Sequence, residues 1–169
     1  MLFLQQIICD MRRKIKNVFA KNDYNCFACS PTNPIGLRLQ FYEEDEYIKS
    51  EWKPSELYEG YPGSIHGGIQ AVLLDEIAAW TMYIKAKCSG VTSRMNIRYR
   101  KQVDSMQDVI ILQGRLKEKR LNLCFIEAQL LNSQHEVCVE AEIIYFAFSA
   151  EKSISDGHFP ANFEEFFQE

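Results

Sequence analysis

The 169-residue chain lacks three features that mark particular classes of protein. A formal net charge of −4 gives it no basic excess, so we expect no nucleic-acid partner. No run reaches the roughly 18 uncharged apolar residues of a membrane span, because Asp75 and Glu76 interrupt the most apolar segment, 69–84. Internal repeats and low-complexity segments are also missing. These absences favour a globular protein with no integral membrane contact.

A secretory signal is not expected either, because the apolar residues of the first segment precede its basic residues and no small-residue cleavage site follows. Two of the six cysteines, Cys124 and Cys138, lie in apolar strand patterns, where free cysteine behaves as a small hydrophobic residue. We therefore expect a reducing, cytoplasmic location.

The residues that are present suit one domain with short extensions, since 47% are hydrophobic and 25% are charged. We predict an N-terminal amphipathic helix within 1–24, a folded domain at 25–150 and a C-terminal tail at 151–169. Apolar residues at helical spacing opposite basic ones indicate the N-terminal helix, which packs on the domain or, alternatively, contacts a membrane surface. The tail is expected to form a short helix on the surface or on a partner subunit.

Hydrophobic patterns in the folded domain predict one long helix and six strands. A hairpin is expected over 37–52 with its turn at 43–46, followed by a helix from about Gly68 to about Lys87 that is apolar on every side. Four further strands are expected at 91–103, 108–119, 121–132 and 136–148. Their short connections favour antiparallel neighbours, so we predict an α+β fold in which an antiparallel sheet of about six strands wraps around the long central helix. The outer side of so apolar a helix also needs cover, which favours a homodimer.

Two adjacent acids, Asp75 and Glu76, lie inside this apolar helix. Neither has a Lys or Arg three or four residues away, and adjacent helical residues differ by about 100° in direction. Because an unpaired buried carboxylate is costly, we expect at least one of them to have a functional task. The alternative is that both face solvent along one edge of the helix.

The glycines at the start of the helix predict a site for a ligand oxygen. The first N–H groups of a helix have no intrahelical partner, and Gly67 and Gly68 leave them open to approach. This outlines an oxyanion hole, with an ordinary helix-starting turn as the alternative. Gly67 and Asp75 are eight residues apart, about 12 Å along a helix, so one chain cannot easily bring both to one carbonyl. Two antiparallel copies of the helix can do so across a two-fold axis.

The stretch IHGGIQAVLLDE resembles the helix motif of hotdog-fold acyl-CoA thioesterases, in the PaaI-like and 4-hydroxybenzoyl-CoA thioesterase-related branch. The upstream NCFACSPTNPIGLRLQF is also similar to a segment before the first strand of many members, and the likeness spans about 25–148. The resemblance implies a hotdog fold, hydrolysis of an acyl-CoA substrate, a homodimer or dimer of dimers (homotetramer), and no metal or organic cofactor.

The resemblance also implies roles for particular residues. Asp75 activates water or attacks the thioester carbonyl, the Gly67 N–H polarises the carbonyl oxygen, and His66 shapes the pocket. A hydroxyl early in the following strand matches Thr92 or Ser93. Some relatives carry an Asn or Gln side chain where this chain has Gly60, which leaves the backbone N–H as the main oxyanion donor. Our expected substrate-binding residues are Gly60, Gly68, Glu76, Thr92, Ser93 and Arg94.

Two further clusters have open interpretations. Arg94, Arg98 and Arg100 alternate along one strand and suit the phosphates of coenzyme A, or else form a solvated edge or a subunit contact. Cys26 and Cys29 form a C-x-x-C for which a plain turn is our default. Zinc or redox chemistry is the alternative there, although a zinc site needs four ligands and no second Cys/His pair follows nearby.

Two rival functions use the same fold. A non-catalytic acyl or acyl-CoA binding protein is consistent with the missing loop amide at Gly60. A dehydratase commonly pairs a catalytic His with the helix acid, but the surroundings of His66 do not resemble that group. Acyl-chain length and carrier-protein use do not follow from the fold.

Overall fold

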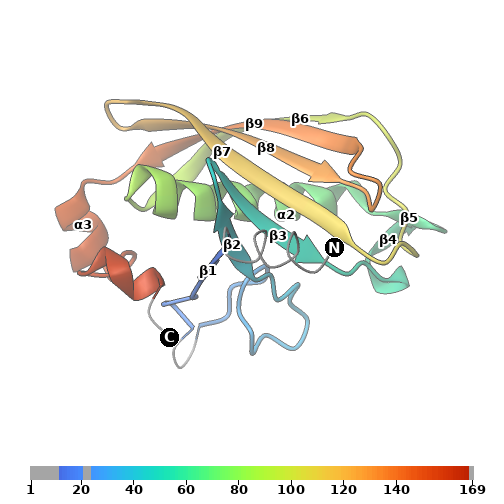
Figure 1. The fold of residues 1–169 in the computed structure, drawn as a ribbon, viewed down its shortest axis with the longest axis horizontal. Coiled ribbons are helices and arrows are strands. Elements are labelled where there is room, and N and C mark those ends of the chain that lie inside the picture. The colour runs from blue at the N-terminus through green and yellow to red at the C-terminus, as the bar shows by residue number, and fades with distance from the viewer. Residues whose placement is uncertain (1–11, 21–23, 168–169) are drawn as a thin grey trace, which may run out of the picture.

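A long central helix lies against one face of an antiparallel sheet in the computed structural model, which describes residues 12–20 and 24–167 (Figure 1). The helix α2 spans Gly67–Thr81 and continues as the π-helical turn η2, Met82–Ala86. It ends at Lys87, whose φ of 52° is left-handed. Leu73, Leu74 and Ile77 are fully buried, because the sheet curls around the helix as its all-round apolar pattern predicts.

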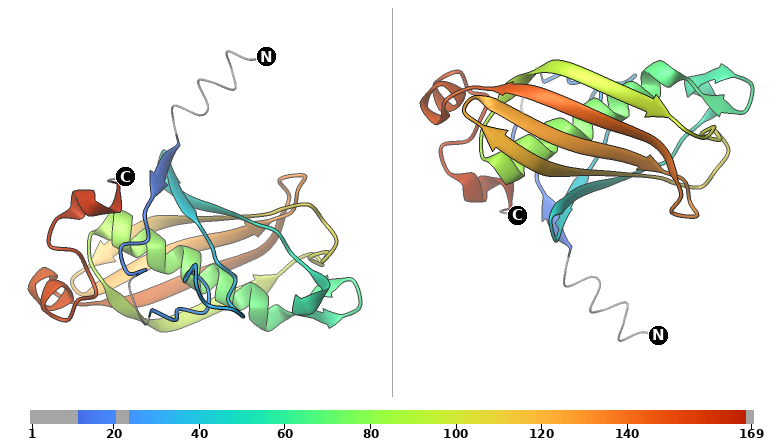
Figure 2. Two further views of the ribbon diagram at one scale, coloured as in Figure 1. Left: turned by 90° about the horizontal axis from the view of Figure 1, so that it is seen from below. Right: turned by 90° about the horizontal axis from the view of Figure 1, so that it is seen from above.

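The main sheet has seven strands in the order β1-β2-β3-β7-β8-β9-β6, and every neighbouring pair is antiparallel. Its strands are β1 Arg13–Ile15, β2 Phe41–Glu44, β3 Tyr47–Trp52, β6 Gly90–Tyr99, β7 Ile110–Arg120, β8 Leu123–Leu131 and β9 Val137–Ala147. A 3-10 turn, η1 Glu56–Tyr58, and a small hairpin of β4 Glu59–Tyr61 and β5 Ser64–Ile65 lead into α2. The sheet covers α2 from above, while β2 and β3 bend down beside it (Figures 1 and 2).

The core lies between the helix and the sheet. Trp80, on α2, is fully buried and stacks on Phe41 of β2 with ring centroids 4.5 Å apart. Alternate residues of β7, β8 and β9 point at the helix, which explains the period-two pattern of these strands.

The amino-terminal segment departs from the prediction. We expected an N-terminal helix within 1–24, but Arg13–Ile15 form β1 and pair with β2, which adds a seventh strand to the predicted six. Ile15 is buried, and the N–H of Lys16 donates to the carbonyl oxygen of Phe166, so contacts distant in sequence override the local helical spacing. Residues 1–11 of that predicted helix lie outside the described part of the chain.

The carboxyl-terminal tail lies mostly on the surface, as expected, but anchors one aromatic side chain in the core. It contains a short helix, α3 Ala150–Ser155, and a 3-10 turn, η3 Phe163–Phe166. Phe166 is fully buried and packs edge-on against Trp80 at 6.1 Å between ring centroids. None of the helices within 12–20 and 24–167 is long and apolar enough to span a membrane.

Candidate active site

The start of α2 is held by its own residues. His66 is the N-cap, and its Nδ1 accepts a hydrogen bond of 2.9 Å from the N–H of Gly68. Its backbone N–H donates to the carbonyl oxygen of Tyr58 at 2.8 Å, which fixes the cap to the preceding turn. The imidazole therefore accepts the hydrogen bond of the Gly68 N–H, while the His66 side chain stays exposed to solvent.

The N–H of Gly67 is the donor that this cap leaves open. It has no acceptor among the residues that the structure describes, while the carbonyl oxygen of Gly67 accepts a 3.0 Å bond from the Tyr99 hydroxyl. Gly67 lies at the positive end of the helix dipole, and a carbonyl oxygen that develops negative charge is favoured there. Of the two predicted glycines, Gly67 rather than Gly68 has the free donor.

Asp75, two turns further along α2, is oriented by two hydroxyl groups. Its Oδ1 accepts bonds from Thr92 Oγ1 at 2.8 Å and from the Tyr145 hydroxyl at 2.7 Å. Tyr145 also lies 2.8 Å from the carbonyl oxygen of Asp75. Neither bond uses Oδ2, which has no partner within the described residues. This half-buried carboxylate thus has one fixed oxygen and one oxygen available for a water molecule.

Tyr145 is the site residue that our sequence reasoning missed. It comes from β9, 70 residues after Asp75, and it is buried. Burial and the neighbouring Asp75 carboxylate raise the pKa of Tyr145, which keeps its hydroxyl protonated as a donor. Its inward position in the β9 alternation was the available signal, because a buried tyrosine needs a hydrogen-bond partner for its hydroxyl.

Glu76 has surroundings different from those of Asp75, as expected for adjacent helical residues. Its Oε1 accepts a 2.9 Å bond from the Trp80 indole N–H, and the Cys26 thiol lies 3.7 Å from both carboxylate oxygens. Burial, reinforced by the nearby Cys26, raises the pKa of Glu76 to about 7. In the described part of the chain, one group of three side chains could bind a metal ion: Cys26, Cys29 and Glu76.

The structure does not bring the other predicted substrate-binding residues together in one place. Gly60, in β4, lies beside the cap, and a side-chain carbon there would come within 3.2 Å of the His66 ring. Ser93 is exposed where the β6–β9 pairing shifts register. Arg94 is exposed and lines a pocket of about 310 Å³ together with Asn96 and Lys117.

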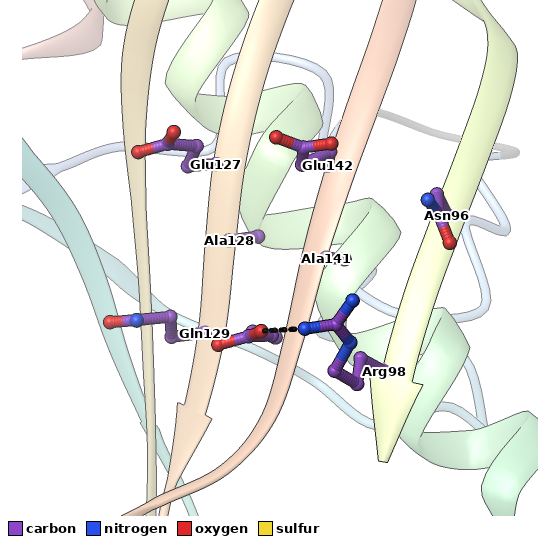
Figure 3. A pocket seen from close by; sticks show the side chains of 8 residues that line it. Asn96, Arg98, Glu127, Ala128, Gln129, Ala141 and Glu142 are labelled. Atoms are coloured by element: carbon purple, nitrogen blue, oxygen red, sulfur yellow. Dashed lines mark ion pairs between the residues drawn. The ribbon is translucent and has the colours of Figure 1, made fainter. Parts of the chain in front are cut away.

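A neighbouring pocket of about 370 Å³ lies on the sheet face turned away from α2 (Figure 3). Asn96, Arg98 and Glu142 line it, with the helix visible behind the strands. Arg98 and Arg100 both pair with Glu140, Arg98 at 3.8 Å. Arg94 lines the adjacent pocket, which shares Asn96, so Arg94 and Arg98 lie on this outer face rather than at the Asp75 cluster. Arg100 reaches the same face through its ion pair with Glu140.

The sequence of the chain also matches a known protein family. Residues 62–139 match the family model described as the thioesterase superfamily. The predicted thioesterase resemblance is confirmed. None of the curated proteins compared with the chain matches its sequence.

Solved structures show that this chain has the hotdog fold. One thioesterase superfamily protein is 20% identical with a TM-score of 0.67, and the match covers 72% of this chain but only 60% of the other. A hypothetical thioesterase with coenzyme A from Streptococcus pneumoniae is 23% identical, with a TM-score of 0.57 over 62% of this chain and 83% of that one. A Streptococcus mutans protein bound to acetyl-CoA is 16% identical, with a TM-score of 0.60 over 76% and 96%.

Proposed function

We propose that the protein hydrolyses an acyl-CoA thioester to the free acid and CoA, at a site shared between the two subunits of a dimer. The observation that carries this proposal is the Asp75 carboxylate, which two hydroxyls orient by one oxygen and leave open at the other. The match to the thioesterase superfamily and the similarity of fold to coenzyme A-bound proteins support the choice of substrate class.

In the proposed reaction, Asp75 of one subunit takes a proton from a water molecule whose oxygen adds to the thioester carbonyl carbon. The Gly67 N–H of the other subunit stabilises the negative charge that develops on the carbonyl oxygen. When the intermediate collapses, the carbon–sulfur bond breaks and CoA leaves as a thiol with the proton held by Asp75. Thr92 and Tyr145 keep the carboxylate in position through their hydrogen bonds to it. His66 accepts a hydrogen bond from the Gly68 N–H, which leaves the Gly67 N–H free for the substrate.

The edge of the sheet supports the dimer. Strand β6 ends the strand order, so its outer side pairs with no strand of the described chain. Val91 and Tyr99 on this edge are 53% and 52% exposed in the single chain, as expected of residues that a second copy covers. Thr92, which holds Asp75, lies on the same strand. A partner along β6 would therefore lie next to the carboxylate.

Replacing Asp75 by Asn tests the chemistry, because the amide keeps an oxygen for Thr92 and Tyr145 but cannot take a proton from water. We expect Asp75→Asn to fold like the wild type and to lose about 10²- to 10⁴-fold in kcat. The assay incubates each protein with a panel of acyl-CoAs and a dye that reacts with the released thiol. Asp108→Asn, the same chemical change at an exposed residue just before β7, is the matched control. Turnover by Asp75→Asn equal to the wild type would remove the catalytic role of this residue.

Binding of acyl-CoA without turnover is the second candidate function. Gly60 favours it, because a side-chain amide that assists the oxyanion in some relatives has no counterpart beside His66. Equilibrium dialysis together with the thiol-release assay distinguishes the two functions. A binding protein retains acyl-CoA in dialysis but releases no thiol with any member of the panel.

A further inference from the structure

The loop before β2 meets the central helix at a cluster of two thiols and one carboxylate. The side chains of Cys26 and Cys29, from the loop, and Glu76, from α2, have their ligand atoms within 4.8 Å of one another. The two sulfur atoms are 2.8 Å apart, and Cys26 Sγ is 3.7 Å from both oxygens of Glu76. The proposed thioester chemistry uses none of these three side chains.

We propose that Cys26, Cys29 and Glu76 bind a Zn²⁺ ion that fastens this loop to α2. Two thiolates and one carboxylate are ligands that zinc accepts. The plain turn expected from the sequence did not include the third ligand, because Glu76 is 50 residues from Cys26 and the fold alone brings them together.

The distances in the cluster fit such an ion with one small adjustment. Tetrahedral zinc, with bonds of about 2.3 Å to sulfur and about 2.0 Å to oxygen, separates a sulfur from an oxygen ligand by about 3.5 Å and two sulfurs by about 3.8 Å. The sulfur–oxygen distances of 3.7 Å agree with this. The sulfurs, at 2.8 Å, have to separate by about 1 Å. The fourth position is left for a water molecule, which can enter because Cys26 is half-exposed.

The backbone of the loop is already arranged around the Cys26 sulfur. The N–H of Cys29 donates to Cys26 Sγ at 3.1 Å, and the N–H of Ser30 donates to the Cys26 carbonyl oxygen at 3.1 Å. The turn therefore holds the Cys26 sulfur in place beside Glu76.

The lack of a cationic partner for Glu76 among the described residues favours a metal ion over a disulfide at this cluster. Glu76 forms no ion pair with a Lys or Arg of the described chain; its hydrogen-bond donors there are the Trp80 indole and the Cys26 thiol. A divalent cation supplies the positive charge that this buried carboxylate lacks. A disulfide between Cys26 and Cys29 supplies no positive charge.

The test begins with the wild-type chain, purified under reducing conditions without chelator. Mass spectrometry of the metal content is expected to find one Zn²⁺ per chain. Replacing the zinc with Co²⁺ is expected to give a thiolate-to-cobalt charge-transfer band and the visible absorption of tetrahedral cobalt. This readout needs no variant, so it stands even if a substitution in the cluster impairs folding, and it is independent of thioesterase activity.

Variants assign the ligands. Loss of a side chain that only hydrogen-bonds to a metal ligand costs about 10- to 100-fold in metal affinity. Loss of a ligand itself should cost more, so we expect Cys26→Ser and Glu76→Gln to weaken zinc binding by at least about 100-fold. Cys138→Ser, which removes a buried thiol from β9 outside the cluster, is expected to bind zinc like the wild type. The proposal is overturned if the reduced wild type binds neither zinc nor cobalt, if Cys26→Ser retains full affinity, or if only a Cys26–Cys29 disulfide is found.

Discussion

At the scale of single residues, the adjacent acids Asp75 and Glu76 show how one step along a helix changes the chemistry. Asp75 faces two hydroxyls from β6 and β9, whereas Glu76 faces an indole and a thiol on another side of α2. No cation neutralises either acid through an ion pair in the described structure. Hydrogen bonds hold Asp75 in place, and burial raises the pKa of Glu76. The same residue class therefore supplies a water-activating group and a metal ligand in our proposals.

The donor at Gly67 can be removed without disturbing the helix. Proline is favoured at the first position of a helix, and the extended backbone of His66, with φ −56° and ψ 134°, suits a following proline. We expect Gly67→Pro to fold normally and to lose about 10²- to 10³-fold in kcat, because only the oxyanion donor is missing. The measurement is steady-state hydrolysis of the best acyl-CoA of the panel.

Gly67→Ala is the control for this substitution. It keeps the N–H, and its added carbon lies 3.6 Å from the Tyr99 hydroxyl, an ordinary contact. A loss in Gly67→Ala as large as that in Gly67→Pro would show that crowding, not the donor, explains the effect.

At the scale of elements, the site depends on how closely the sheet approaches α2. Strand β7 lies close to α2 at Gly114, where a side-chain carbon would collide with the Thr81 hydroxyl and lie 3.2 Å from the carbonyl oxygen of Ile77. Thr81 is fully buried, and its hydroxyl donates to that same carbonyl oxygen at 2.7 Å. The absence of a side chain at Gly114 thus sets the distance between helix and strand.

Gly114→Ala is therefore expected to destabilise the fold. The added methyl group overpacks the contact between β7 and α2, which typically costs about 1–3 kcal/mol in free energy of unfolding. Urea denaturation measures this loss. Combining it with Thr81→Ala removes the atoms nearest to the new methyl group, so the double variant should lose less than the sum of the two single ones. A Gly114→Ala variant as stable as the wild type would contradict the close contact.

At the scale of the whole molecule, the proposed site needs two chains. Gly67 and Asp75 lie on one helix about 12 Å apart along its axis, so a single chain presents the two groups to different places. In our proposal, a two-fold dimer along β6 would pair each Gly67 with the Asp75 of the other chain and so create two identical sites. A dimer of dimers retains the same pairs of sites.

Mixed dimers distinguish a shared site from a site within one chain. Asp75→Asn and Gly67→Pro chains, co-expressed with different tags and purified on both, form a dimer in which one site combines the intact Asp75 with the intact Gly67. We expect this mixed dimer to recover about half of the wild-type activity, although each parent dimer is nearly inactive. Activity no higher than that of the parents would place each site within a single chain.

Much of the architecture follows from short-range patterns in the sequence. Period-two alternation predicted β7, β8 and β9 closely, and the apolar run after Gly67 predicted the central helix, because both patterns record which faces are buried. The failure at Arg13–Ile15 has the opposite cause. Helical spacing was present there, but pairing with β2 and contact with Phe166 decided the conformation.

The sequence by itself determined the central helix, its glycine-lined start and strands β7 to β9, since each depends on neighbours within a few residues. It marked Asp75 and Glu76 together, and the resemblance to thioesterases is what favoured Asp75. Only the tertiary structure decided which hydroxyls hold Asp75 and which thiols lie beside Glu76. Tyr145 and Cys26 reach α2 from 70 and 50 residues away in the chain. Contacts over such separations arise from the order of strands in the sheet, which local periodicity does not encode.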